Sequence, residues 1–300
     1  MILSWGREEA FTRWGMMKTI TLAAPAKINL SLRILGKRPD GFHELETLMI
    51  PIGLSDEIEI VHAPGHGISL TCNAPEIPTD SGNLCVRAVE LFREETGIVH
   101  GISISLMKRI PHGAGLGGGS SDAAAVLKGL NALFEEPLVA EELALLAASL
   151  GSDVPFFLHN GPAICRGRGE ILEEAPVIAK RRILLIKPPF PIPTAWAYKR
   201  YAEIKETGTK LPIDPVQYLG PIELVNDLEP PVFSKYLLLP AMKEWLLDQS
   251  AVESAFMTGS GSTMVAVIKP EVAAEEIPAL KQAIQSEFGE TMWVTETCFS

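Results

Sequence analysis

The chain has 300 residues, of which 47% are hydrophobic and 21% are charged, and its formal net charge is −11. This composition is typical of a globular protein with one large domain or two ordinary ones. The acidic balance argues against a nucleic-acid partner, which needs a basic surface, and no apolar run approaches the length of a membrane span.

The N-terminal segment before residue 17 carries no clear pattern, and we expect residues 1–16 to form a poorly ordered extension. The apolar stretch over residues 20–23 imitates a secretory signal only faintly, because its apolar core is too short. The four cysteines show no C-x-x-C spacing, so they are expected to be reduced thiols rather than disulfides or a zinc site. A cytoplasmic protein is therefore predicted.

The first regular element is a strand. Apolar and polar residues alternate over residues 28–34, which predicts a period-two strand with Lys27 and Asn29 on its polar face. Asp40-Gly41 is a strong turn signal, so the chain is expected to reverse there and present the residues that follow.

The rest of the chain mixes strand and helix patterns without a regular βαβ repeat. Residues 102–106 alternate as a strand, and helical spacing follows over residues 123–134 and 143–150. The second half is predicted to hold strands over residues 183–186, 264–268 and 292–297 and helices near residues 195–205, 240–250 and 271–286. This mixture favours an α+β fold over a doubly wound sheet.

The strongest local signal lies between the strand at 102–106 and the helix that follows it. Five glycines fall within residues 113–119 and run into two serines and Asp122. Glycine permits positive φ and lets a ligand approach the bare backbone, and a helix start directs free N–H groups outward. A purely structural turn is disfavoured, because each unused glycine would cost roughly 0.5–1 kcal/mol. The segment predicts a phosphate site.

Two familiar nucleotide motifs do not account for this segment. Gly113, Gly115 and Gly118 match G-x-G-x-x-G, but the acidic residues about 20 positions later lie at the end of a predicted helix rather than a second strand. A Walker A loop needs Gly-Lys-Ser/Thr after its glycines, which is absent. Both interpretations are rejected.

Three other positions admit a structural and a functional interpretation. Asp153 is either a turn or helix-cap residue or a general base, and Lys27 is either a solvated strand residue or the cation that keeps such a carboxylate ionised. Spacing alone does not show that the two meet. The small-residue segment 258–263 is either a hairpin turn or a backbone cradle for phosphate or substrate.

Five segments together resemble the GHMP kinase superfamily. They are Pro25-Ala26-Lys27-Ile28-Asn29-Leu30, Asp40-Gly41-Phe42-His43-Glu44, residues 111–121, Gly151-Ser152-Asp153-Val154-Pro155 and Thr258-Gly259-Ser260-Gly261. The resemblance implies an α+β, two-domain fold, with an ATP-binding domain like ribosomal protein S5 over residues 17–170 and a ferredoxin-like domain over residues 171–300. The first two segments mark kinases that phosphorylate the 2-hydroxyl of a methylerythritol unit linked to cytidine diphosphate.

The resemblance also implies residue roles. Asp153 would be the general base and Lys27 its partner. Contacts to ATP are expected from Asn83 and Lys108 near the adenine and from Pro111, His112, Gly113, Ala114, Gly115, Leu116, Gly117, Gly118, Gly119, Ser120 and Ser121 around the phosphates. Mg²⁺ would bridge the phosphates, with Ser121 as a contact. The small-molecule substrate would contact Asn29, Phe42, His43, Thr194, Tyr198, Gly259 and Ser260.

One departure from the family pattern concerns the cytosine site. The family often has Tyr at the position of Phe42 and can have Phe at that of Tyr198, so we interpret the two as an exchanged pair that sandwiches the base. Two alternatives stay open. A mevalonate- or homoserine-type kinase is disfavoured by the turn around His43, and a non-catalytic nucleotide- or RNA-binding protein by the acidic charge and by Lys27 with Asp153.

Overall fold

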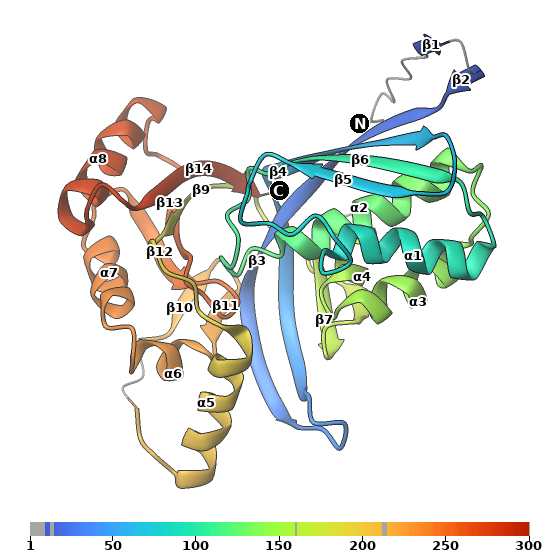
Figure 1. Cartoon of the computed structure of the whole chain (residues 1–300). Helices are drawn as coiled ribbons and strands as arrows, with labels where there is room; N and C mark the ends of the chain where they lie inside the picture. The colour runs from blue at the N-terminus through green and yellow to red at the C-terminus, as the bar shows by residue number, and fades with distance from the viewer. Residues whose placement is uncertain (1–9, 13–14, 160, 212–214, 300) are drawn as a thin grey trace. The chain divides into compact units, whose positions relative to one another are not determined.

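The computed structural model describes residues 10–12, 15–159, 161–211 and 215–299 (Figure 1). The chain divides into two compact units: residues 1–26, 55–110 and 117–160 form unit 1, and residues 27–54, 111–116 and 161–300 form unit 2. Of the predicted N-terminal extension, residues 1–9 and 13–14 lie outside the described residues, whereas β1 (Ala10–Thr12) pairs antiparallel with β2 (Gly15–Met17). The domain boundary after residue 170 stays a prediction.

Two long strands, β3 (Thr19–Lys37) and β4 (His43–Ala63), contribute to both units. The strand predicted over residues 28–34 is confirmed, but its expected polar face is buried as well: Lys27 is 4% and Asn29 3% exposed. The solvated interpretation of Lys27 is therefore wrong. The predicted turn is confirmed, since Gly41 has φ of +87° and the Asp40 carboxylate accepts the Phe42 N–H at 3.1 Å.

Unit 1 packs helices against a small sheet. Strand β5 (Ile68–Cys72) pairs parallel with β6 (Gly101–Met107), and β6 pairs antiparallel with the second half of β4. Figure 1 shows the helices together on one side of these strands: α1 (Leu84–Thr96), α2 (Gly118–Leu133), α3 (Ala140–Leu150) and α4 (Val154–Leu158). Helix α2 approaches the sheet closely at Gly129, where a Cβ would lie 2.5 Å from the Ile60 Cδ1 atom.

Unit 2 contains a mixed sheet in the order β10–β11–β3–β4–β14–β9–β13–β12, with the β7–β8 hairpin paired to β4. The further strands are β7 (Ala163–Gly167), β8 (Ile171–Glu174), β9 (Arg181–Lys187), β10 (Gln217–Leu219), β11 (Ile222–Asn226), β12 (Val252–Met257), β13 (Met264–Ile268) and β14 (Trp293–Phe299). Strands β3 and β11 are parallel, whereas β14, β9, β13 and β12 are antiparallel. The α+β prediction is confirmed, as are the strands predicted near β9, β13 and β14.

The core of unit 2 lies between this sheet and its helices. The helices are α5 (Thr194–Thr207), α6 (Glu229–Phe233), α7 (Leu238–Leu247) and α8 (Ile277–Phe288). Leu239 and Met242 of α7 and Ile284 of α8 are fully buried in the same cluster as Leu184 of β9. Helix α8 begins later than residue 271, the predicted start, because Pro278 occupies its first turn, where proline is favoured. Among the described residues, no helix is both long enough and apolar enough to cross a membrane.

Candidate active site

Within unit 2, the first part of the glycine-rich segment (residues 111–116) packs in direct backbone contact with the 258–263 loop. Gly115 has φ of +76°, and a Cβ at this position would lie 2.5 Å from the carbonyl oxygen of Thr258 and 3.1 Å from that of Gly261. A Cβ on Gly259 would in turn lie 3.0 Å from the carbonyl oxygen of Gly115. Only glycine fits these positions, so two motifs more than 140 residues apart in the sequence build one surface.

The 258–263 loop is also the hairpin turn that the sequence allowed. It joins β12 to β13, and the Thr258 N–H donates to the Thr263 carbonyl at 3.1 Å. Asn226, which the sequence did not single out, fixes the loop: its side-chain amide donates to the carbonyl oxygens of Met257 at 2.7 Å and Gly259 at 2.8 Å. No local motif surrounds Asn226, so only the three-dimensional structure reveals this contact.

Helix α2 of unit 1 starts earlier than expected and is open at its N-terminus. Its N-cap is Gly117, with φ of +71°, and no side chain caps the first turn. Neither serine nor Asp122 performs that task, because all three lie inside the helix. The first turn also carries no acidic residue, so its free N–H groups and the positive end of the helix dipole are left for an anion. The helix thus begins in the glycines, and the binding of phosphate at this segment stays a prediction.

Beneath this helix start lies a buried charge network in unit 1. The Lys108 ammonium donates to the Asp122 carboxylate at 2.7 Å and also contacts the Asp56 carboxylate, while the Ile110 N–H donates to Asp56 at 2.8 Å. Lys108, Asp56 and Asp122 are all nearly inaccessible to solvent. The network ties the end of β6 to the first turns of α2, directly before and after the glycines.

Two residues that the resemblance placed near adenine are engaged inside unit 1. Lys108 holds the two carboxylates just described. Asn83 is the N-cap of α1, where its side chain accepts the Cys85 N–H at 2.9 Å and donates to the Pro78 carbonyl at 2.7 Å. Their contact with adenine stays a prediction.

The charges in this network shift one another's protonation equilibria. Desolvation, assisted by nearby Asp56 and opposed by Lys108, raises the pKa of Asp122 to about 7 overall. Desolvation lowers the pKa of Lys108, but Asp122 and Asp56 more than compensate, so its pKa is raised overall. Ionised Asp122 is thus the unfavourable form of the folded protein.

Replacing Asp122 by asparagine is expected to remove a pH-dependent part of the stability. Because the pKa of Asp122 is higher in the folded chain than its ordinary value of 3.8, its contribution is fully present below about pH 4 and is lost as the pH rises through about 7. Between about pH 5 and pH 8 the free energy of unfolding of the wild type should fall by about 2 kcal/mol relative to Asp122→Asn. Urea unfolding at both pH values measures the difference. Parallel pH profiles of the free energy of unfolding for wild type and Asp122→Asn would contradict this expectation. The control is Asp80→Asn, at an exposed position of the same unit, which should give the wild-type profile.

Lys27 is held by polar groups of unit 2. Its ammonium donates to the Asn29 side-chain oxygen at 2.6 Å, and its backbone N–H donates to the Leu116 carbonyl of the glycine-rich segment at 3.0 Å. The Asn29 amide donates to the Thr47 hydroxyl at 2.8 Å, and the Asn29 N–H donates to the Thr258 hydroxyl at 2.9 Å. Lys27 and Asn29 thus join the two loops into one site. Thr47 was missed because it belongs to no recognisable motif.

Asp153 lies in unit 1, at the N-cap position of α4, and is half-buried. Its side chain makes no capping hydrogen bond to that helix, so a helix cap does not explain it. Lys27 belongs to unit 2, and the approach of these two side chains stays a prediction.

The expected substrate residues all lie in unit 2. The rings of His43 and Tyr198 are stacked with centroids 5.2 Å apart, and the Thr194 and Ser260 hydroxyls are hydrogen-bonded at 2.9 Å. Phe42 is 51% exposed, with the Arg168 guanidinium 5.0 Å from its ring centroid. Burial, assisted by Lys37, lowers the pKa of His43, so a neutral imidazole is available to donate one hydrogen bond and accept another.

Comparison with known families defines the class of this protein. The families described as "GHMP kinases N terminal domain" and "GHMP kinases C terminal" match residues 83–161 and 218–282. The first match contains the glycine-rich segment and Asp153, and the second contains the 258–263 loop. The chain thus belongs to the GHMP kinases.

Individual relatives identify one family within the GHMP kinases. A 4-diphosphocytidyl-2-C-methyl-D-erythritol kinase from Methylacidiphilum infernorum is 48% identical over 273 residues, covering 90% of this chain and 93% of the relative. A protein of the same name from Geobacter sp. (strain M21) is 41% identical over 267 residues, covering 88% and 94%. A crystal structure of 4-(cytidine 5'-diphospho)-2C-methyl-D-erythritol kinase superposes with a TM-score of 0.71 at 31% identity, covering 94% of this chain and 100% of the other. The chain belongs to the family of 4-diphosphocytidyl-2-C-methyl-D-erythritol kinases.

Proposed function

We propose that this chain transfers the γ-phosphoryl group of ATP to the 2-hydroxyl of 4-diphosphocytidyl-2-C-methyl-D-erythritol, a step of the non-mevalonate route to isoprenoid precursors. The observation that carries the proposal is the single surface built by the glycine-rich segment, the 258–263 loop and the Lys27–Asn29 pair. It occurs in a chain 48% identical to a kinase of that name over nine-tenths of its length.

ATP would bind with its phosphates along the glycine-rich segment. Glycines with positive φ expose backbone N–H groups there, and the uncapped start of α2 adds the positive end of a helix dipole. The Lys108 network keeps β6 and α2 in register on either side of the segment, which is a positioning role for Lys108, Asp56 and Asp122.

The chain also offers a fitting contact for Mg²⁺. The Ser121 hydroxyl is buried and has no hydrogen-bond partner in the structure, and the same is true of one Asp122 carboxylate oxygen. An oxygen ligand with no protein partner suits a hard cation that arrives with the phosphates. Mg²⁺ bound there would neutralise charge on the β- and γ-phosphates.

The transfer itself would use Asp153 and Lys27. The substrate hydroxyl gives its proton to the Asp153 carboxylate, its oxygen forms a bond to the γ-phosphorus, and the bond from that phosphorus to the β-phosphate oxygen breaks to release ADP. Lys27, oriented by Asn29, would stabilise negative charge on the transferred group. Positioning carries much of the rate enhancement in such reactions, because the transition state is largely dissociative.

The substrate's cytosine would stack between Phe42 and Tyr198, with the neutral His43 beside Tyr198 as its hydrogen-bond partner. We expect Phe42→Ala and Tyr198→Ala each to raise the KM for the cytidylyl substrate by about 10-fold or more, because stacking on one aromatic ring contributes about 1–3 kcal/mol. The KM for ATP should not change. Steady-state kinetics measure both constants.

The matched control is Tyr218→Ala, which removes an aromatic ring that is 59% exposed on β10 of the same unit. It should leave both constants unchanged. An unaltered KM for the cytidylyl substrate in Phe42→Ala and Tyr198→Ala would rule out the sandwich.

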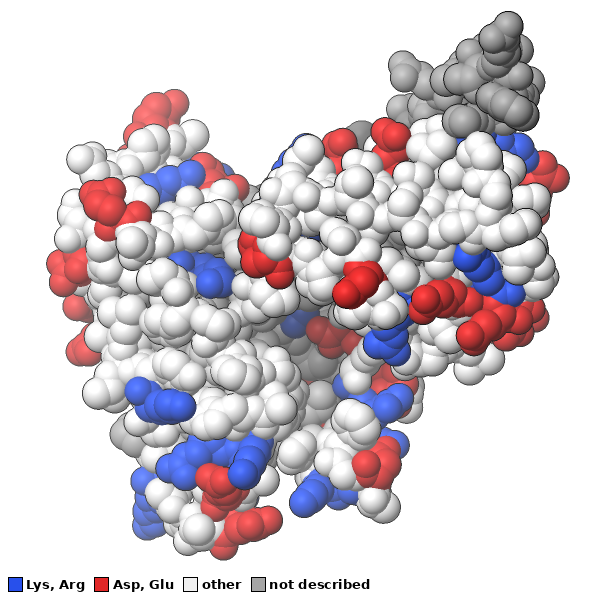
Figure 2. All heavy atoms as spheres, viewed as in Figure 1, with Lys and Arg blue, Asp and Glu red and all other residues white. Residues whose placement is uncertain are grey.

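A nucleic-acid partner forms no part of the proposal. The chain carries a net charge of −11, and Figure 2 shows acidic and basic side chains interspersed on the visible face rather than a continuous basic surface.

A substrate panel tests the proposed function against the nearest alternative, a mevalonate- or homoserine-type kinase. ADP release with ATP and Mg²⁺ should depend on the cytidylyl substrate, whereas mevalonate or homoserine in its place should give only background. Turnover of mevalonate or homoserine at a rate comparable to that of the cytidylyl substrate would contradict the proposal.

A further inference from the structure

Unit 2 contains a buried ion pair of its own, between helices α6 and α7. The Lys243 ammonium of α7 donates to the Glu229 carboxylate of α6 at 2.7 Å. Lys243 is 5% and Glu229 8% exposed, so both charges have lost most of their contact with water. The cost of desolvation in such a pair can exceed the attraction between the charges, and apolar residues of similar volume often stabilise a fold equally well. The pair therefore calls for an explanation other than stability.

The ion pair adjoins the outer edge of β12. Among the strands that the structure describes, β12 is the last of its sheet, and its strand partner is β13. Side chains satisfy its outward backbone groups. Gln217 accepts the Ala255 N–H at 3.0 Å and donates to the Ala255 carbonyl at 2.9 Å, while Asn226 donates to the Met257 carbonyl. The second oxygen of the Glu229 carboxylate accepts the Met257 N–H at 2.7 Å. These side chains thus take the place of a neighbouring strand.

The bond from Glu229 meets the chain directly before the 258–263 loop. Met257 ends β12, and Thr258 is the first residue of the loop. The Thr258 hydroxyl accepts the Asn29 N–H at 2.9 Å, and the Asn29 side chain accepts the Lys27 ammonium at 2.6 Å. A displacement of Met257 would therefore pass to Thr258 through one peptide bond and to Asn29 through one hydrogen bond. The position of Lys27 is thus coupled to the ion pair by a short series of bonds.

We infer that the Glu229–Lys243 pair positions the 258–263 loop for phosphoryl transfer. Glu229 holds the Met257 N–H, and Lys243 orients Glu229 and compensates its charge, so both are positioning residues. An ionised carboxylate accepts an N–H more strongly than a neutral oxygen does, and a carboxylate buried without its cation is costly. This explains why an ion pair occupies a place where apolar side chains would serve stability. The catalytic part of the inference rests on the proposed function, whereas the support of the loop does not.

Two double variants separate support of the loop from stability. Glu229→Met/Lys243→Met removes both charges and the acceptor of the Met257 N–H. Glu229→Gln/Lys243→Met removes both charges and keeps an acceptor oxygen. Gln and Met are similar in size, and each variant leaves one buried N–H group without its acceptor, so the two melting temperatures should agree within about 5 °C.

The value of kcat and the amide exchange of residues 257–263 should distinguish the two variants. Glu229→Met/Lys243→Met should lower kcat by at least about 10-fold, because a shift of about 1 Å at a catalytic site can cost about 10²-fold in rate. It should also speed amide exchange in that segment by at least about 10-fold, because local opening becomes easier. Glu229→Gln/Lys243→Met should stay close to wild type in both. Mass spectrometry measures the exchange without any substrate.

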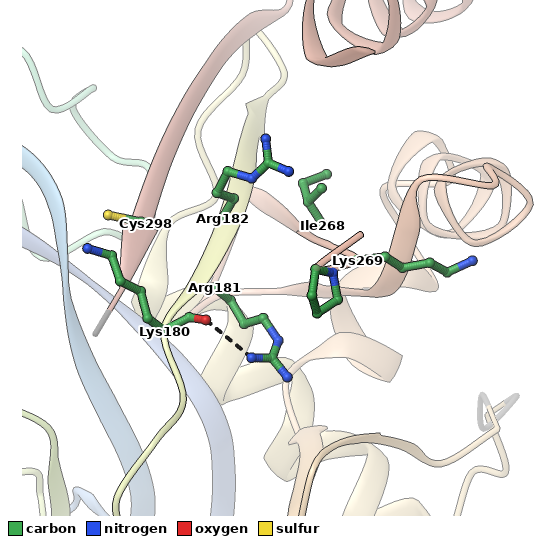
Figure 3. A pocket seen from close by; sticks show the side chains of 7 residues that line it. Lys180, Arg181, Arg182, Ile268, Lys269 and Cys298 are labelled. Carbon is green, nitrogen blue, oxygen red and sulfur yellow. Dashed lines mark hydrogen bonds between the residues drawn. The ribbon is translucent and has the colours of Figure 1, made fainter. Parts of the chain in front are cut away.

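The matched control removes a different ion pair from the same strand. Arg181→Met/Glu253→Gln breaks the contact of 3.3 Å between the Arg181 guanidinium and the Glu253 carboxylate. Glu253 lies four residues before Met257 on β12, about 13 Å away at a rise of about 3.3 Å per residue. Figure 3 shows Arg181, at the start of β9, among the residues that line a pocket of about 260 Å³. The control should keep the wild-type kcat and the wild-type exchange of residues 257–263.

Three outcomes would overturn the inference: equal kcat in the two Glu229 variants, equal exchange of residues 257–263 in those variants, or an equal loss in the control. A kcat that fell only in proportion to the melting temperature would assign the pair to stability alone. Absence of turnover in the wild type would contradict the proposed function, and the exchange comparison would still decide whether the pair supports the loop. Glu229→Leu/Lys243→Met replaces the first variant if that variant does not fold.

Discussion

Asp153→Asn is expected to lower kcat by on the order of 10³-fold while ATP still binds. The amide keeps the size and shape of the carboxylate but cannot accept the proton of the substrate hydroxyl, and general-base catalysis contributes typically 10²–10⁴-fold. ATP affinity should change little, because the glycine-rich segment and the start of α2 provide the phosphate contacts. Single-turnover kinetics measure the chemical step, and calorimetry with an ATP analogue measures binding.

The control for this substitution is Asp248→Asn, which makes the same chemical change at an exposed position at the end of α7. It should retain wild-type kinetics. If Asp153→Asn lowered kcat by less than about 10-fold, Asp153 would not be the base. A loss of ATP binding in the same variant would indicate that Asp153 supports the fold of the site rather than the reaction.

Gly115→Ala should have the second-largest effect, a fall in kcat/KM for ATP by on the order of 10²-fold. The new Cβ would lie 2.5 Å from the Thr258 carbonyl oxygen, so the glycine-rich segment and the 258–263 loop must separate. The Cβ would also lie 3.1 Å from the Gly261 carbonyl oxygen. Both oxygens belong to the backbone, so no flexible side chain can move aside to relieve the clash. A displacement of about 1 Å at a catalytic site can cost about 10²-fold in rate. Steady-state kinetics with varied ATP measure the loss.

Gly208→Ala separates this clash from simple backbone strain. Gly208 has φ of +63°, close to the +76° of Gly115, but nothing lies within 4 Å of its Cβ position. Both variants should lose about 1 kcal/mol of stability from the left-handed conformation, and only Gly115→Ala should lose activity. Equal activity in the two variants would show that the close packing of the loops does not matter for catalysis.

Local patterns predicted much of the fold. The alternation over residues 28–34, the Asp40-Gly41 turn and strand β13 depend on side-chain period and turn chemistry, which are properties of neighbouring residues. The helix that follows the glycine-rich segment was predicted for the same reason, whereas phosphate binding by the segment stays a prediction.

Prediction from the sequence failed for features that depend on contacts between residues far apart in the chain. Lys27 was compatible with a solvated strand face, but it is buried: its backbone bonds to Leu116, and its ammonium bonds to Asn29. Asn29 is in turn held by Thr47 and Thr258. The network of Lys108 with Asp56 and Asp122 joins residues 52 and 14 positions apart. No periodic pattern connects residues at these separations. The raised pKa of Asp122 therefore follows only from the folded structure.

Phosphorus NMR of the product tests the proposed reaction most directly. Wild-type protein is incubated with ATP, Mg²⁺ and 4-diphosphocytidyl-2-C-methyl-D-erythritol labelled with carbon-13 at the carbon that bears the 2-hydroxyl. We expect a new phosphomonoester resonance coupled to that carbon, formed in a one-to-one ratio with ADP. ADP release without that resonance, or a phosphate on a different hydroxyl, would contradict the proposed reaction.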